Sequence, residues 1–88
     1  MTLTFPNAAR SYDEAGKRVR FLGHDGMFEI RFFVEIEAFA KALSRAAGSE
    51  KDYLAAFDAL RGKILDAARS AYSSNRKNTI VLTAGDIK

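Results

Sequence analysis

Residues 17–36 contain two runs in which apolar and polar side chains alternate, KRVRFLGH and MFEIRFFVEI, separated by Asp25-Gly26. An Asp-Gly pair between two such runs is the strongest short-range signal for a β-hairpin. If these two residues form the loop, the register of the two strands follows directly. It places Phe21 opposite Ile30, Val19 opposite Phe32, and Gly23 opposite Phe28.

The two faces of this hairpin differ in character, because side chains alternate between the faces of a strand. One face is apolar and is predicted to form the core; it carries Val19, Phe21, Phe28, Ile30, Phe32, Val34 and Ile36. On the other face the predicted register pairs Arg18 with Phe33, Arg20 with Arg31, Leu22 with Glu29, and His24 with Met27.

Shorter strand signals stand at the two ends of the chain. Leu3 and Phe5 alternate with threonines, and Pro6 ends this run. Residues 7–16 are predicted to form a loop that ends in a turn at 13–16, with Ser11 and Tyr12 extending the sheet briefly. Residues 79–83 are rich in β-branched side chains and follow a polar turn. Because residues 80–82 are all apolar, this strand is either covered on both faces or leaves one apolar side chain on the surface.

Helical spacing of apolar residues follows the hairpin. A first helix is predicted over Glu37 to Ala47, stopped by Gly48. Ser49 is predicted to cap a second helix, with Asp52 completing a capping box, and this helix is expected to run to about Ser73. Gly62, inside the second helix, suggests close packing or a slight bend.

The order of these elements, β-β-β-α-α-β, predicts a two-layer α+β fold. We expect a sheet of about four strands, made of the N-terminal strand, the hairpin and the C-terminal strand, with two helices packed on one face. The chain has 88 residues, so a single domain spanning 1–88 is expected.

Composition places the chain among ordinary soluble proteins, with 48% apolar and 28% charged residues. There is no cysteine, and the N-terminal MTLTFPNAAR does not resemble a secretory signal, so a cytoplasmic location is expected. The net charge of +3 is spread evenly: residues 1–34 hold five basic and four acidic side chains, and residues 35–88 hold nine and seven. Such a distribution is more typical of a solubility feature than of a phosphate-binding surface.

Several stretches together resemble one family of small bacterial proteins. They are FP near the start, VRF in the first hairpin strand, EIEAFAKAL after the second, F-x-x-x-R-x-x-I in the second helix, and VLTAGDI at the end. In this order they resemble domain of unknown function 1488, over Leu3 to Ile87. The resemblance implies a compact, stand-alone α+β fold of bacterial origin, and it implies no activity, cofactor or catalytic residue.

The sequence contains no recognisable catalytic constellation. His24 is the only histidine, and no phosphate-binding loop, GxSxG or HExxH motif occurs. Acidic residues at helix starts, such as Glu37 and Glu50, are explained by the helix dipole. Asp86 in TAGDI is interpreted as a turn or cap residue. We therefore predict no cofactor, no metal site and a non-catalytic role.

The polar face of the hairpin is the surface that the sequence indicates as a candidate binding site. Its candidate binding residues are Arg18, Arg20, Leu22, Met27, Glu29, Arg31 and Phe33. Three interpretations compete: a solvated face, a protein interface such as a symmetric dimer, and a nucleic-acid platform built on Phe33 among arginines. We favour a non-catalytic module that uses this face for self-association or protein binding. Weak nucleic-acid binding through Arg18, Arg20 and Arg31 is the alternative, and no membrane contact is expected.

Overall fold

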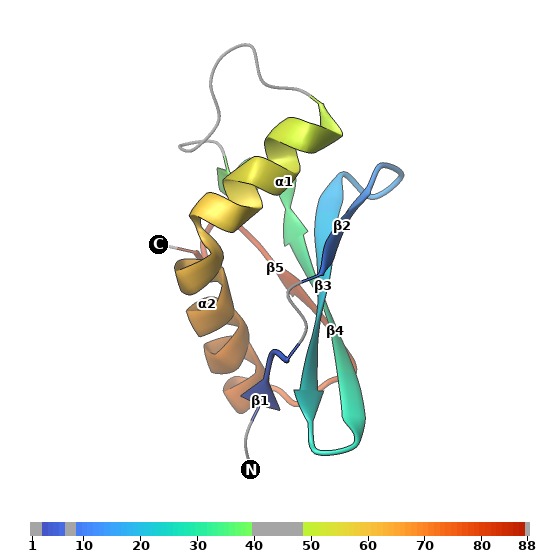
Figure 1. The fold of residues 1–88 in the computed structure, drawn as a ribbon. Coiled ribbons are helices and arrows are strands. Elements are labelled where there is room, and N and C mark those ends of the chain that lie inside the picture. Colours follow the sequence, from blue (N-terminus) through green and yellow to red (C-terminus); the bar gives the residue numbers. More distant parts are fainter. Residues whose placement is uncertain (1–2, 7–8, 40–48, 88) are drawn as a thin grey trace.

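A computed structural model describes residues 3–6, 9–39 and 49–87. It confirms the α+β fold, with both helices on one face of the sheet (Figure 1). Within these residues the sheet has five strands, one more than the sequence predicted. In chain order the elements are β1 (Leu3–Thr4), β2 (Arg10–Asp13), β3 (Arg18–Asp25), β4 (Phe28–Glu35), the 3₁₀ helix η1 (Ile36–Phe39), α1 (Glu50–Ala59), α2 (Arg61–Ser74) and β5 (Thr79–Leu82).

The hairpin of β3 and β4 is present, but its predicted register is wrong by two residues. Phe21 lies opposite Phe32, not Ile30, and Asp25 pairs with Phe28 as the last pair before the loop. The loop is therefore Gly26-Met27. Gly26 has φ 62°, so the glycine supplies the left-handed residue at the first loop position instead of the second. A shift of two residues keeps each side chain on its predicted face, because the period of a strand is two.

The extra strand is β2, which lies within the region predicted to be mostly a loop. The expected extension of the sheet at Ser11 and Tyr12 is confirmed, and the strand runs from Arg10 to Asp13. Both β1 and β2 pair antiparallel with β3, each with a different part of that strand. At the opposite end of the sheet β5 pairs with β4, and this pairing is parallel.

The helical region differs from the prediction in two ways. The first predicted helix, 37–47, begins as the 3₁₀ helix η1, and residues 40–48 of the prediction lie outside the described residues. The second predicted helix is two helices, α1 and α2, which meet at Leu60. The predicted capping box of Ser49 and Asp52 is confirmed. Gly62 has open space where a Cβ would stand, so close packing does not explain it, and the bend occurs at Leu60.

The core lies between the sheet and the helices and is rich in aromatic rings. The rings of Phe21 and Phe32 stack at 5.1 Å, and Phe57 of α1 lies 5.2 Å from Phe21 between ring centres. Gly23 leaves room for this cluster, because a Cβ there would stand 2.9 Å from the Phe5 ring and 3.0 Å from the Phe32 ring. Phe28, which was predicted to belong to the core, is instead 72% exposed, since it lies at the hairpin tip.

Candidate functional site

One face of the sheet is not covered by the described helices α1 and α2, and we call it the open face. The fully buried strand residues, such as Val19, Phe32 and Leu82, point to the helices, and their neighbours in sequence point away. Figure 1 shows both helices on the opposite side of the strands. From the pairing of the strands, the open face carries Ser11, Asp13, Arg18, Arg20, Leu22, His24, Glu29, Arg31, Phe33, Glu35, Thr79 and Val81.

The candidate residues from the sequence lie on this face, with one exception. Met27 stands in the hairpin loop and is 99% exposed. Together with Phe28 it makes an apolar tip beyond the end of the open face. The remaining candidates form a continuous group on the two central strands: Arg18, Arg20, Leu22, Glu29, Arg31 and Phe33.

The corrected register changes the cross-strand partners on the open face. Arg20 lies opposite Phe33, and Leu22 lies opposite Arg31. The predicted like-charge pair of Arg20 and Arg31 is therefore wrong, as are the pairs of Leu22 with Glu29 and of His24 with Met27. Each of these two arginines faces an apolar side chain across the strands, an arrangement in which the aliphatic part of arginine can cover apolar surface.

Arg18 contacts both a ring and a carboxylate on the open face. Its guanidinium carbon lies 3.8 Å from the centre of the Phe33 ring, which is a cation–π contact. The two residues are diagonal neighbours and not the directly opposed pair that the sequence predicted. Arg18 Nε also donates a hydrogen bond of 2.9 Å to Asp13 Oδ2. This bond, together with the Gly16 N–H, holds the pKa of the Asp13 carboxyl below its ordinary value. The arginine and the ring are thus held in place before any partner arrives.

Acidic and basic side chains alternate across the open face. Asp13 pairs with Arg18 in the strand register, and Arg18 in turn lies opposite Glu35. Glu29 lies on β4 two residues from Arg31. Because these carboxylates stand among the arginines, the face does not present a field of one sign. A protein surface with mixed charges complements such a pattern better than a polyanion does.

Two residues of β5 extend the open face and were not among the sequence candidates. Val81 lies beside Phe33 and is 43% exposed, and Thr79 lies beside Arg31. The unbroken apolar run at residues 80–82 was the signal for Val81, since one of its members had to reach the surface if the strand was not covered on both faces. The sequence did not show that β5 would join β4 and so place Val81 next to Phe33.

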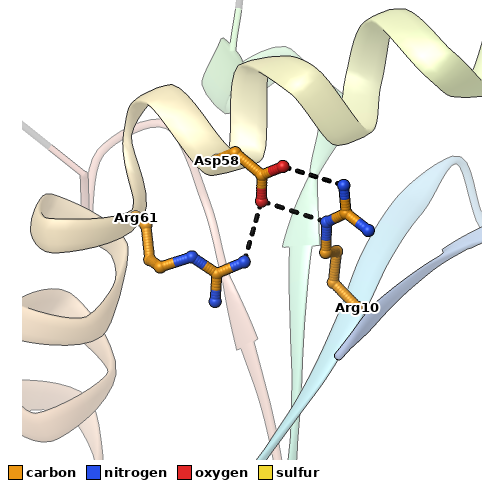
Figure 2. Close-up of polar contacts among 3 residues, drawn as sticks. All are labelled: Arg10, Asp58 and Arg61. Carbon is orange, nitrogen blue, oxygen red and sulfur yellow. Dashed lines mark hydrogen bonds and ion pairs between the residues drawn. The ribbon is translucent and has the colours of Figure 1, made fainter. Parts of the chain in front are cut away.

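The strongest ionic cluster lies on the helix side and has a structural role. Figure 2 shows Asp58 of α1 between two arginines. Arg10 of β2 donates to both of its oxygens, at 3.0 and 2.8 Å, and Arg61 donates at 2.8 Å. The Arg10 contact is the main reason that the pKa of Asp58 is lowered. The cluster ties β2 to the helix layer and keeps its arginines away from the open face.

A second polar contact fixes the hairpin to α2. The Tyr72 hydroxyl donates a hydrogen bond of 2.6 Å to Asp25 Oδ2, and this bond is the main cause of the raised pKa of Tyr72. Asp25 is therefore held by the helix layer at the last pair before the loop.

Within residues 3–6, 9–39 and 49–87, no three His, Asp or Glu side chains lie close enough together to hold a metal ion.

The predicted cap role of Asp86 is confirmed. Its Oδ2 accepts hydrogen bonds from the Thr83 backbone N–H at 2.9 Å and from the Thr83 hydroxyl at 3.1 Å. The aspartate of TAGDI thus closes the turn directly after β5.

A family model for proteins of unknown function, DUF1488, matches residues 3–82. The chain belongs to the DUF1488 family. This confirms the resemblance seen in the sequence. Searches of curated proteins and of solved structures gave no significant match. No helix in the described part of this DUF1488 chain is both long and apolar enough to cross a membrane.

Proposed function

We propose that this DUF1488 protein is a non-catalytic interaction module that binds protein through its open face. The observation that carries the proposal is the contact of Arg18 with Phe33. It holds an aromatic ring and an arginine together on a sheet face that neither of the described helices covers. Arginine and aromatic residues are enriched at the centres of protein interfaces.

The surroundings of this pair fit a protein partner. Leu22, Phe33 and Val81 supply apolar area next to the exposed Arg20 and Arg31. Side chains that are already ordered lose little rotamer freedom on binding, which favours affinity. The carboxylates on the same face weaken the attraction for a nucleic acid and offer ion pairs to a partner with mixed charges.

Affinity capture with Phe33→Glu tests the proposal. Ser70→Glu is the matched control, because it adds the same charge at an exposed position of α2, in the helix layer. We expect the wild type and Ser70→Glu to retain the same protein, and Phe33→Glu to lose it; binding of the purified partner is then compared by calorimetry. Equal retention by all three forms, with a wild type that sediments as a monomer at every concentration, would refute the proposal.

The nucleic-acid alternative has a separate signature. Retention of RNA or single-stranded DNA that falls with ionic strength, and that Arg20→Glu weakens more than Lys63→Glu does, would favour that alternative over protein binding. Lys63 is the matched control because it is an exposed cation on α2.

A further inference from the structure

The outer edge of β5 is a free strand edge in the described part of the chain. The sheet ends at β5, whose paired neighbour is β4. A groove of about 390 Å³ lies beside the strand, so the helix layer does not close over this edge. Residues lining the groove include Ala71 and Asn75 of α2, together with Lys77, Ile80 and Asp86.

The backbone groups that face the free edge can be identified. Asn78 accepts a hydrogen bond from the Arg31 N–H at 2.8 Å, so the carbonyl of residue 78 points to β4. Backbone groups alternate in direction along a strand in a sheet, so those of Ile80 and Leu82 also point to β4. The N–H and C=O of Thr79 and Val81 therefore point outward. The next outward N–H, that of Thr83, is occupied by the Asp86 carboxylate.

The two edges of the sheet differ in how well they are protected from pairing with a strand of another chain. Edge strands are commonly protected by charged residues, prolines or bulges. The edge strand β2 carries Arg10 and Asp13, both in ion pairs. The four residues of β5 are Thr-Ile-Val-Leu, with no charge and no proline. Association through strand pairing is thus expected at β5.

We propose that the free edge of β5 pairs antiparallel with β5 of a second copy of this chain, about a two-fold axis through Ile80. In this register Thr79 lies opposite Val81 of the second copy, and each pair exchanges two backbone hydrogen bonds. A shift of two residues toward the C-terminus would need the Thr83 N–H, which Asp86 occupies. The aspartate therefore disfavours a shift in that direction.

Charge complementarity favours a second copy over an unrelated strand. Lys77 precedes β5, and Asp86 follows it. Antiparallel pairing about Ile80 brings Lys77 opposite Thr83 of the second copy, whose N–H is capped by Asp86. Because of the two-fold axis, Lys77 of each copy lies near Asp86 of the other. The same axis stands perpendicular to the sheet, so the open faces of both copies form one continuous surface.

The pairing uses the backbone edge of β5, whereas the proposed function uses side chains of the open face. Val81 belongs to both, so the test needs a control that changes its side chain and keeps its N–H. Sedimentation of the full chain over a concentration series measures it. We expect a monomer–dimer equilibrium that Val81→Pro shifts to the monomer, with a dissociation constant raised about tenfold or more, because proline removes an outward N–H in each copy. The intramolecular ladder does not use that N–H, so the fold is retained. Val81→Thr, which keeps the N–H and the branched shape, is the control and should remain dimeric.

A cysteine probe tests the register and does not depend on the proline variant. Opposed residues of a non-hydrogen-bonded pair have Cα atoms about 4.5 Å apart, within the range of a disulfide, about 4.4–6.8 Å. The chain has no cysteine, so Ile80→Cys introduces a single thiol. Under mild oxidation we expect a disulfide-linked dimer from Ile80→Cys and far less from Phe28→Cys, an exposed thiol at the hairpin tip.

The outcomes separate the two proposals. A wild type that is monomeric at the highest attainable concentration, a dimer that Val81→Pro leaves intact, or equal cross-linking of the two cysteine variants would overturn the edge pairing. A dimer that Phe33→Glu breaks and Val81→Pro does not would support the open face and overturn the edge pairing. A dimer that only Val81→Pro breaks, with capture of other proteins unaffected by Phe33→Glu, would support the edge pairing and count against the proposed function.

Discussion

Phe32 and Phe33 are neighbours in β4, and they show how differently the two faces of the sheet are built. Phe32 is fully buried and packs against the rings of Phe5 and Phe21. Phe33 is half-buried, and the guanidinium of Arg18 lies over its ring. The inner face is explained by the core that it forms. The open face carries an aromatic ring and arginines that are not part of the buried core, which is why we propose that it binds a partner.

The largest expected effect separates these two rings. Phe32→Ala should lower the free energy of unfolding by about 3–5 kcal/mol, because it removes a buried ring and leaves a cavity. Phe33→Ala should cost about 1 kcal/mol or less, since solvent already reaches the ring. Urea unfolding of both variants measures the difference. Similar losses for both would mean that the open face contributes to the fold as much as the core does.

The glycines provide the second contrast. Gly23→Ala should destabilise the protein by about 1–3 kcal/mol, because its Cβ would press on the rings of Phe5 and Phe32. Gly62→Ala, where a Cβ meets open space within α2, should stabilise by about 0.5–1 kcal/mol. Thermal unfolding gives both values. An unchanged free energy of unfolding for Gly23→Ala would show that the rings of Phe5 and Phe32 can move aside to admit a Cβ.

Tyr72 links the inner face to the base of the hairpin loop. Tyr72→Phe removes the hydrogen bond to Asp25 and should lower the Tm by about 5 °C. The pKa of Tyr72 is raised in the fold, so its contribution is present below the ordinary value of 10.0 and is lost as pH rises above it.

The phenylalanine variant should therefore lose less stability than the wild type between neutral and strongly alkaline pH. A residual loss is expected from Tyr12, whose pKa is raised mainly by desolvation. Parallel alkaline profiles for the two proteins would contradict the role given to the Tyr72–Asp25 bond.

The smallest effect concerns Asp58, whose ion pairs are partly exposed. Asp58→Asn should cost about 1 kcal/mol or less at neutral pH, because solvent screens both arginine contacts. The pKa of Asp58 is lowered in the fold, so the contribution is present above the ordinary value of 3.8 and disappears as pH falls below it. Urea unfolding at neutral and at acidic pH checks this, and a difference that persists in acid would exclude the ion pairs as its source.

The sequence predicted the faces of the hairpin correctly although it predicted the wrong register. An error of two residues leaves Phe21, Phe32 and Arg18 on their faces, because the strand period is two. The error changed only the cross-strand partners, among them the predicted pairing of Arg20 with Arg31. In the structure Gly26 is the first loop residue, and Asp25, the last paired residue before it, accepts a hydrogen bond from Tyr72. The Asp-Gly pair alone does not distinguish this arrangement from a loop made of Asp25 and Gly26.

Local sequence patterns could not predict which strands, distant in the sequence, pair with each other. The apolar run at residues 80–82 predicted a strand, but its parallel pairing with β4 is set by how the helices cross the sheet. The position of Val81 on the open face is therefore known from the structure and could not be predicted from the sequence. The break at Leu60 was likewise invisible to helical periodicity, which continues through both helices, while local capping chemistry at Ser49 was predicted correctly.

The most direct test of the account is whether the open face can be disabled without harming the fold. Capture and thermal unfolding are compared for the wild type, Phe33→Glu and Ser70→Glu under one set of conditions. We expect closely similar melting temperatures for all three proteins and loss of the bound protein from Phe33→Glu alone. Retention of that protein by Phe33→Glu, with its fold intact, would contradict the assignment of the open face to binding.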